Sequence, residues 1–315
     1  MTVPTAASGA GDLDPRVRVA AFDWLRGQVD SAGDDVLPLG LLRRGFEYRG
    51  ARVPLLGPQG IFKPAILPEI PLSITTAPDG PYDDSFTADG LLSYRYRGTD
   101  PDHRDNAGLR TAMRHQAPLV YFHGVVRGQY LAIWPVFIVG DDPGRLAFRV
   151  AADDIRLADA AAQHAARAPG EAREDEGRRA YITSIVRVRL HQRSFRERVL
   201  RAYRDQCALC RLRHRDLLDA AHIVPDADES GDPSVPNGLA LCKIHHAAFD
   251  RLLIGVRPDY VVEVQPRILD ETDGPMLRHG LQGLHRTSLV VPAARRDRPD
   301  PDRLAQRYER FRGAA

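Results

Sequence analysis

Two closely spaced pairs of metal-ligand residues constrain this chain more than any other feature. Cys207 and Cys210 are separated by two residues, and so are Cys242 and His245. Each such pair can grip a tetrahedral zinc ion from one side, and together the pairs use all three cysteines of the chain. Four protein ligands leave zinc no open position, so we expect a structural site whose loss unfolds its module. Free core cysteines are the alternative.

The bulk composition is that of a soluble protein with more than one hydrophobic core. The chain has 315 residues, of which 43% are hydrophobic and 27% charged. No apolar run approaches the roughly 20 residues that cross a bilayer, and residues 1–9 do not resemble a signal peptide. We therefore expect a cytoplasmic protein without membrane contact, in which cysteines are metal ligands rather than disulfides.

The first half of the chain is dominated by a β pattern. A short helix is predicted at 15–29 and a helical turn at 38–48. Short apolar runs separated by Gly, Pro and Asp then predict a small barrel or sandwich between residues 53 and 150. These runs lie at 70–74, 91–96, 119–122, 130–139 and 146–150.

A linker rich in Ala, Arg and Glu divides the chain. We place an N-terminal domain at 1–155, the linker at 156–180 and a C-terminal domain at 181–315. The latter opens with a helix predicted at 181–205, whose apolar side holds Val186, Leu190, Phe195, Val199, Leu200 and Tyr203. Seven arginines on this helix favour a surface that follows DNA phosphates, with a solvated helix face as the alternative.

The segment around the second cysteine pair resembles the HNH nucleases of the ββα-metal fold. That family has a histidine ending the first strand, an asparagine in the next loop, and a helix histidine followed by a ligand one turn later. Here these are His222, Asn237, His246 and Asp250. The resemblance implies that His222 is the general base, that Asn237 orients the loop bearing it, and that His246 and Asp250 bind one Mg²⁺ or Mn²⁺.

Phosphodiester hydrolysis explains these residue types. A histidine with a near-neutral pKa can take a proton from water, and a divalent cation offsets charge on the phosphorane and the leaving 3′ oxygen. On a helix, His246 and Asp250 are four residues apart and share a face. His245 and His246 point about 100° apart, which fits one zinc ligand and one catalytic ligand.

One position departs from the family pattern. Many members carry an Asp or His ligand immediately before the base, where this chain has Ala221. Asp219 is one replacement, although strand alternation points residues 219 and 222 to opposite faces. Water or a DNA phosphate is the other.

Residues 45–150 resemble the SET-and-RING-associated (SRA) domains. The Tyr-Asp-Asp at 82–84 and the Tyr-Arg-Gly at 96–98 match the acidic loop and the aromatic strand end of that family. The resemblance implies a PUA-like β-barrel that flips a modified cytosine out of duplex DNA.

A flipped base is stacked between aromatic rings and read along its Watson–Crick edge. We therefore predict Tyr82 and Tyr96 as the stacking walls and Asp84 as the acceptor for the cytosine amino group. Tyr94 and Asp83 are the alternatives. A hairpin with cross-strand tyrosines and turn-forming aspartates is the purely structural interpretation.

Together the resemblances imply an α+β protein, with an SRA-like β-barrel and flanking helices joined to a zinc-stapled HNH domain. The implied function is a modification-dependent, type IV-like restriction endonuclease that binds double-stranded DNA containing 5-methylcytosine or a related base. Structural Zn²⁺ and catalytic Mg²⁺ or Mn²⁺ are expected, and a homodimer, because one HNH site cuts one strand. The alternatives are a non-catalytic reader of methylated DNA with a degenerate HNH module, and an HNH nuclease sensing another modification.

Overall fold

The chain divides into two compact units. The computed structural model describes residues 13–78, 91–153, 186, 190–225, 228 and 231–314. The units are Met1–Leu190 and His191–Ala315, and both mix helices with strands, so the expected α+β class is confirmed. The limits of the linker stay a prediction, because 156–180 lies outside the described residues. No helix in the described part of the chain has the length and apolar character needed to cross a bilayer.

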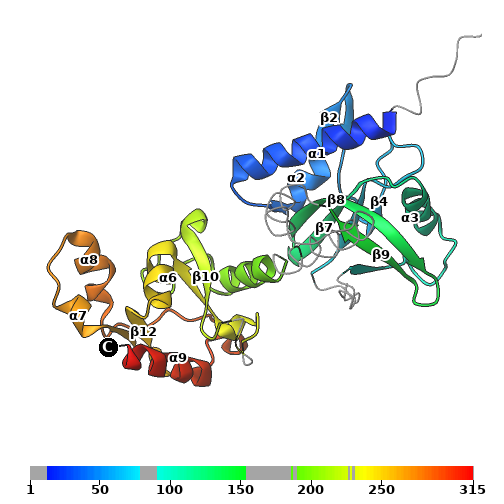
Figure 1. Cartoon of the computed structure of the whole chain (residues 1–315). Coiled ribbons are helices and arrows are strands. Elements are labelled where there is room, and N and C mark those ends of the chain that lie inside the picture. The colour runs from blue at the N-terminus through cyan, green and yellow to red at the C-terminus, as the bar shows by residue number, and fades with distance from the viewer. Residues whose placement is uncertain are drawn as a thin grey trace, which may run out of the picture. The chain divides into compact units, whose positions relative to one another are not determined.

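A curled sheet lies at the centre of the first unit (Figure 1). Six of its described strands follow the order β4-β5-β7-β8-β9-β6, and β1 pairs with β8. Only the β5–β7 pair among them is parallel. Whether the sheet closes as a PUA-like barrel stays a prediction. The strands are β1 (Val36–Pro38), β4 (Ile61–Phe62), β5 (Ser73–Thr76), β6 (Leu92–Arg95), β7 (Leu119–Val126), β8 (Gln129–Asp142) and β9 (Ala147–Ala152).

Three helices and a small hairpin accompany this sheet. The hairpin pairs β2 (Phe46–Tyr48) with β3 (Ala51–Val53), and the helices are α1 (Leu13–Ala32), α2 (Leu39–Arg44) and α3 (Arg104–Arg114). α1 confirms the helix predicted at 15–29. α3 adds a helix within residues 53–150, where the sequence predicts a small barrel or sandwich. Its buried Leu109 and Ala112 pack into the core, a helical spacing that the β pattern around it concealed.

The central strands are buried on both faces. In β7, Leu119 and Tyr121 belong to one hydrophobic cluster, while Val120 and Phe122 belong to another that includes α1. This alternation is the two-residue period of a strand. It explains why these strands appear in the sequence as continuous apolar runs.

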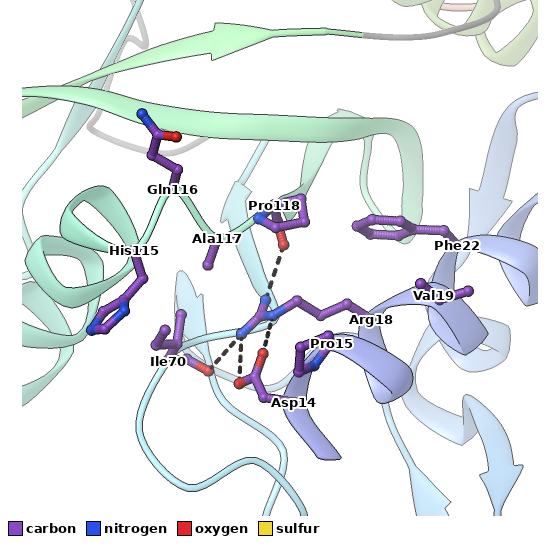
Figure 2. Close-up of a pocket in the computed structure, with 10 residues that line it drawn as sticks. All are labelled: Asp14, Pro15, Arg18, Val19, Phe22, Ile70, His115, Gln116, Ala117 and Pro118. Carbon is purple, nitrogen blue, oxygen red and sulfur yellow. Dashed lines mark hydrogen bonds and ion pairs between the residues drawn. The ribbon is translucent and has the colours of Figure 1, made fainter. Parts of the chain in front are cut away.

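The buried Arg18 fastens α1 to the segments that lead into the neighbouring strands β5 and β7. Its side chain is 2% exposed and donates to the carbonyl oxygens of Ile70, Pro71 and Pro118 and to the carboxylate of Asp14. Figure 2 shows the guanidinium pointing between these groups, in the wall of a pocket of about 400 Å³. Because all its N–H groups are engaged, Arg18 has a structural role and offers the pocket no donor.

Replacing Arg18 is expected to weaken the first unit selectively. Arg18→Met leaves buried carbonyl oxygens and Asp14 without their donor, which should cost about 3–5 kcal/mol. Both tryptophans, Trp24 and Trp134, lie in this unit, so urea unfolding followed by tryptophan fluorescence measures it alone. Arg26→Gln is the control, since its pair with Asp23 is exposed and should change stability by less than about 1 kcal/mol. Equal urea unfolding curves for Arg18→Met and Arg26→Gln would contradict the structural role of Arg18.

The second unit is a set of small sheets covered by helices. Its strands pair as β10 (Leu218–His222) with β11 (Gly238–Cys242), and β12 (Ile254–Val256) with β13 (Val262–Val264). The helix labelled α6 (Lys243–Asp250) follows β11 directly and packs on the β10–β11 hairpin (Figure 1). The remaining helices are α7 (Pro266–Leu269), α8 (Pro275–Gly280) and α9 (Pro301–Gly313).

The helix predicted at 181–205 is described at residue 186 and from 190 to 202. Its predicted apolar side is confirmed, since all six residues are buried: Val186, Leu190, Phe195, Val199, Leu200 and Tyr203. The first two pack in the cluster of the first unit and the other four in that of the second.

Candidate functional site

The four predicted zinc ligands converge. Their ligand atoms all lie within 4.8 Å of one another, with Nδ1 of His245 3.4 Å from Sγ of Cys207 and 3.2 Å from Sγ of Cys242. The Sγ atoms of Cys210 and Cys242 are 4.0 Å apart. Two sulfurs on a tetrahedral zinc ion with bonds of about 2.3 Å would be about 3.8 Å apart, so the quartet fits zinc.

The three cysteines of the quartet shift one another's pKa values. The hydrogen bond between Cys207 and Cys242 lowers the pKa of the Cys207 thiol and raises the pKa of Cys242, while burial raises the pKa of Cys210. Three thiolates this close repel one another unless a cation lies between them. The other imidazole nitrogen of His245, Nε2, lies 2.7 Å from the carbonyl oxygen of Gly280, which ties the end of α8 to the site and orients the ring.

The predicted base, His222, ends β10 and pairs with Gly238 at the start of β11. Its half-buried ring stacks on Phe195, with centroids 3.9 Å apart and planes 11° apart. Gly238 makes this packing possible, because a Cβ there would lie 2.8 Å from the Phe195 ring and 2.5 Å from Val199. The helix at 190–202 therefore packs on the face of the hairpin that carries His222. Sequence reasoning found Phe195 as a core residue but had no signal for this contact.

Enlarging Gly238 tests that packing. Gly238→Ala should destabilise the second unit by about 1–3 kcal/mol, because Phe195 and Val199 must move aside. Calorimetry of the full chain measures the unfolding of the second unit, which is the transition that tryptophan fluorescence does not detect. Gly274→Ala is the control, since nothing lies within 4 Å of its added Cβ. If Gly238→Ala unfolds at the same temperature as the control, the close approach of Phe195 and Val199 to Gly238 is absent.

Asn237 is fully buried and connects the two ends of the loop between the strands. Its Oδ1 accepts from the backbone N of Val224 at 2.9 Å, and its Nδ2 donates to the carbonyls of Val224 and Asp232 at 3.0 and 2.8 Å. An amide that satisfies three backbone groups at once fixes Val224 and Asp232 relative to each other.

His246 lies between two carboxylates. Its Nδ1 is 3.6 Å from Oδ2 of Asp219, and its Nε2 is 3.3 Å from Oδ2 of Asp250. Asp219, followed by Asp250, raises the pKa of His246 against the effect of burial, and His246 in turn lowers the pKa of Asp219. Nε of Arg196 lies 3.5 Å from Oδ1 of Asp219, the carboxylate oxygen that does not face His246.

The position of Asp219 agrees with strand alternation. Residues two apart on a strand share a face, so Asp219 lies on the face of Ala221, where the family's usual ligand stands, rather than on that of His222. The contact of Asp219 with His246 agrees with this. His222 and His246 therefore approach the hairpin from opposite faces. Within the described residues, only the zinc quartet brings three or more ligand atoms within 4.8 Å of one another.

Some predicted DNA-contacting arginines are engaged inside the unit. Arg196 donates to the carbonyls of Arg215 and Leu218, and Arg198 donates to those of Ser194 and Pro233. Arg196 braces the helix against β10, which reduces its share in a phosphate-binding surface, whereas Arg198 stays exposed.

In the first unit, the structure describes one of the three predicted base-pocket residues. Tyr96 is 2% exposed, its ring lies 4.6 Å from that of Phe148, and its hydroxyl bonds to Asp141 and Arg110. These are contacts of a core residue, and its role as a stacking wall stays a prediction. The alternative, Tyr94, is also buried.

The other two pocket residues, Tyr82 and Asp84, lie outside the described residues, as does Asp83. Their roles stay predictions as well.

Comparison with known proteins identifies a family for part of the second unit. Residues 207–257 match the model of the HNH endonuclease family. The C-terminal region is an HNH endonuclease domain. The matched segment holds all four zinc ligands, His222, Asn237, His246 and Asp250. No curated protein matches the chain.

Two solved structures of restriction endonucleases are similar to this chain. One is described as a modification-dependent TagI restriction endonuclease, with 15% identity over 77% of this chain and 82% of that one, and a TM-score of 0.30. The other is the type IV phosphorothioation-dependent restriction endonuclease ScoMcrA, with 17% identity and a TM-score of 0.20. The latter match covers 57% of this chain and 47% of that one. Scores this low do not establish a shared fold.

Proposed function

We propose that this protein is a modification-dependent DNA endonuclease, whose HNH domain hydrolyses phosphodiester bonds and whose first unit binds DNA containing a modified cytosine. The observation that carries the nuclease proposal is His246, which lies between Asp219 and Asp250 in an HNH domain. His222 lies on the other face of the β10–β11 hairpin from Asp219 and His246. A phosphodiester at the hairpin end would thus have a base on one flank and a cation on the other.

The carboxylate of Asp250 fits a hard divalent cation such as Mg²⁺ or Mn²⁺, and His246 would add one nitrogen ligand. Nε2 of His246 and the carboxylate of Asp250 are the groups that would hold it, with water and DNA phosphate completing the shell. Asp219, which faces the other ring nitrogen, would then accept a hydrogen bond from the Nδ1–H group and fix the tautomer, as carboxylates commonly do behind metal-bound histidines. A bound cation would offset negative charge on the phosphate and the leaving oxygen.

His222 would take a proton from water as the water oxygen bonds to phosphorus. The bond from phosphorus to the 3′ oxygen then breaks, which leaves a 5′-phosphate and, once solvent protonates the leaving oxygen, a 3′-hydroxyl. Stacking on Phe195 fixes the orientation of the His222 ring, and Asn237 holds Val224 and Asp232 in place, so the base is positioned before DNA binds.

The first unit supplies the proposed specificity. The Tyr-Asp-Asp and Tyr-Arg-Gly motifs support a flipped 5-methylcytosine or related base, with Tyr82 and Tyr96 stacking on it and Asp84 reading its edge. The burial of Tyr96 makes Tyr82 and Asp84 the first positions to substitute. A double-strand break would need two HNH sites, which we propose a homodimer provides.

Digestion of matched DNA tests the whole proposal. Duplexes of one sequence carrying cytosine, 5-methylcytosine or 5-hydroxymethylcytosine are incubated with the protein and Mg²⁺ or Mn²⁺. Cleavage of a modified duplex alone supports the proposal, and equal cleavage of all three removes the modification dependence. Tight binding of a modified duplex without cleavage supports the degenerate reader, for which Ala221 is the specific observation.

A further inference from the structure

The C-terminal helix α9 lies beside the proposed cation site, although it is outside the segment that matches the HNH family. Asp300 caps its first turn by accepting from the backbone N of Asp302 and Arg303. Arg303, Arg307 and Arg310 follow at helical spacings of four and three, so they share one face. That face meets the loop after His222 and the end of α6.

The two outer arginines of this face hold the loop. Arg303 forms a bidentate pair with Asp232, at 2.9 and 2.8 Å, and lowers the pKa of that carboxyl. Arg310 bonds to Asp228 at 2.9 Å. Asp232 is also the residue whose carbonyl accepts from Asn237, so α9 and Asn237 hold the same stretch of chain.

The middle arginine reaches the end of α6. Arg307 is 8% exposed, its Nη2 donates to the carbonyl of Phe249 at 2.9 Å, and its guanidinium carbon lies 4.6 Å from the Phe249 ring centroid. The same Nη2 is 3.8 Å from Oδ1 of Asp250. The other oxygen of that carboxylate, Oδ2, is the one that faces His246.

We propose that Arg307 is a positioning residue of the cation site: it holds one oxygen of Asp250 and so directs the other oxygen toward His246. This inference rests on the proposed function, because it assigns Asp250 and His246 to the cation. Burying a guanidinium is costly, and within the described residues its Nε has no hydrogen-bond partner. An apolar residue would fill the space at lower cost, so packing alone does not explain an arginine there.

A purely structural role is the competing explanation, since a cation near a helix C-terminus stabilises the helix. The two roles differ in what a substitution changes. Loss of a helix cap lowers stability but leaves cation affinity alone. Loss of a residue that orients a metal ligand typically lowers metal affinity by about 10–100-fold. Electrostatics alone predict the opposite sign, because removing a positive charge beside the site should tighten cation binding.

Mn²⁺ titration of the zinc-loaded full chain tests the proposal without relying on cleavage. Calorimetry or electron paramagnetic resonance measures Mn²⁺ affinity for wild type, Arg307→Gln, Arg307→Lys and Asp250→Asn. Arg312→Gln is the matched control, since Arg312 is an exposed arginine on the same helix that pairs only weakly with Glu309. We expect affinity about 10–100-fold weaker for Arg307→Gln, an intermediate loss for Arg307→Lys, and no change for Arg312→Gln.

The outcomes separate this inference from the proposed function. If Arg307→Gln binds Mn²⁺ as tightly as wild type or more tightly, while Asp250→Asn binds weakly, the positioning role is wrong and the cation site stands. If wild type shows no Mn²⁺ site that Asp250→Asn weakens, both are abandoned. If Arg307→Gln does not fold, Arg307→Lys decides in its place, because it keeps the charge and part of the contact with Asp250.

Discussion

Replacing Cys210 by serine is expected to unfold the second unit and leave the first intact. Zinc held by four protein ligands contributes about 10–16 kcal/mol in small zinc modules, which matches or exceeds the 5–15 kcal/mol of a typical domain. Cys210 is the ligand to choose because its side chain is exposed, whereas Cys207 and Cys242 are buried. Its removal takes a sulfur from the metal without opening a cavity in the core.

The structure explains why the loss should spread. Cys242 ends β11 and precedes α6, while His245 fixes Gly280 at the end of α8. Without zinc, the hairpin, α6 and α8 lose their common anchor, and three crowded thiols remain.

The experiment compares zinc content, far-UV circular dichroism and limited proteolysis for Cys210→Ser and wild type. Cleavage sites should appear between 191 and 315, and zinc should be lost. The fluorescence of Trp24 and Trp134 should not change, because both lie in the first unit. Arg213→Ala, an exposed neighbour of the first cysteine pair, should resemble wild type. A zinc-free Cys210→Ser protein that resists proteolysis as wild type does would show that zinc is not structural.

The zinc quartet and the HNH residues could be predicted from sequence because their information is local. Cys-x2-Cys, Cys-x2-His and the four-residue spacing of His246 and Asp250 each lie within one turn or one helix, where spacing determines geometry. The apolar side of the helix at 190–202 was predictable for the same reason. All six residues on that side are buried, as the helical period alone predicts.

What could not be predicted depends on contacts between distant segments. Phe195 reaches His222, and Arg307 reaches Asp250, across 27 and 57 residues of sequence respectively. Neither residue type signals such a contact, since a phenylalanine on a helix is ordinarily core and an arginine ordinarily surface. Their contribution appears only when the helices flanking the matched segment pack on it.

Helix α3 and the contact of Asp219 both depend on more than the local pattern around them. α3 was missed because its short amphipathic repeat, with Leu109 and Ala112 buried, lies among apolar runs of strand length. The predicted alternation of residues 219 and 222 to opposite faces agrees with the structure, and the position that bears on the role of Asp219 is Ala221, two residues away on the same face. Strand alternation, applied to that residue, favours the contact with His246 that the structure has.

Replacing His222 by alanine is expected to lower the rate of DNA cleavage by about 10²–10⁴-fold while leaving DNA binding and Mn²⁺ affinity unchanged. The base is needed only to take a proton from water, so substrate and cation do not depend on it. Asp250→Asn should behave differently, since it should lose cleavage and Mn²⁺ affinity together. The two variants therefore separate the base from the cation site on the same hairpin and helix.

His222 also packs on Phe195, so the loss of the ring must be separated from the loss of the base. Phe195→Leu removes the stacked ring and keeps the imidazole, so it should cost about 0.5–1.5 kcal/mol of stability and lower the cleavage rate far less than His222→Ala does. Initial rates of nicking on a modified plasmid, measured at saturating Mn²⁺, compare the variants directly. Cleavage by His222→Ala within tenfold of wild type would falsify the base assignment. If wild type and His222→Ala both bind Mn²⁺ and modified DNA and neither cuts the DNA, the HNH module serves recognition rather than hydrolysis.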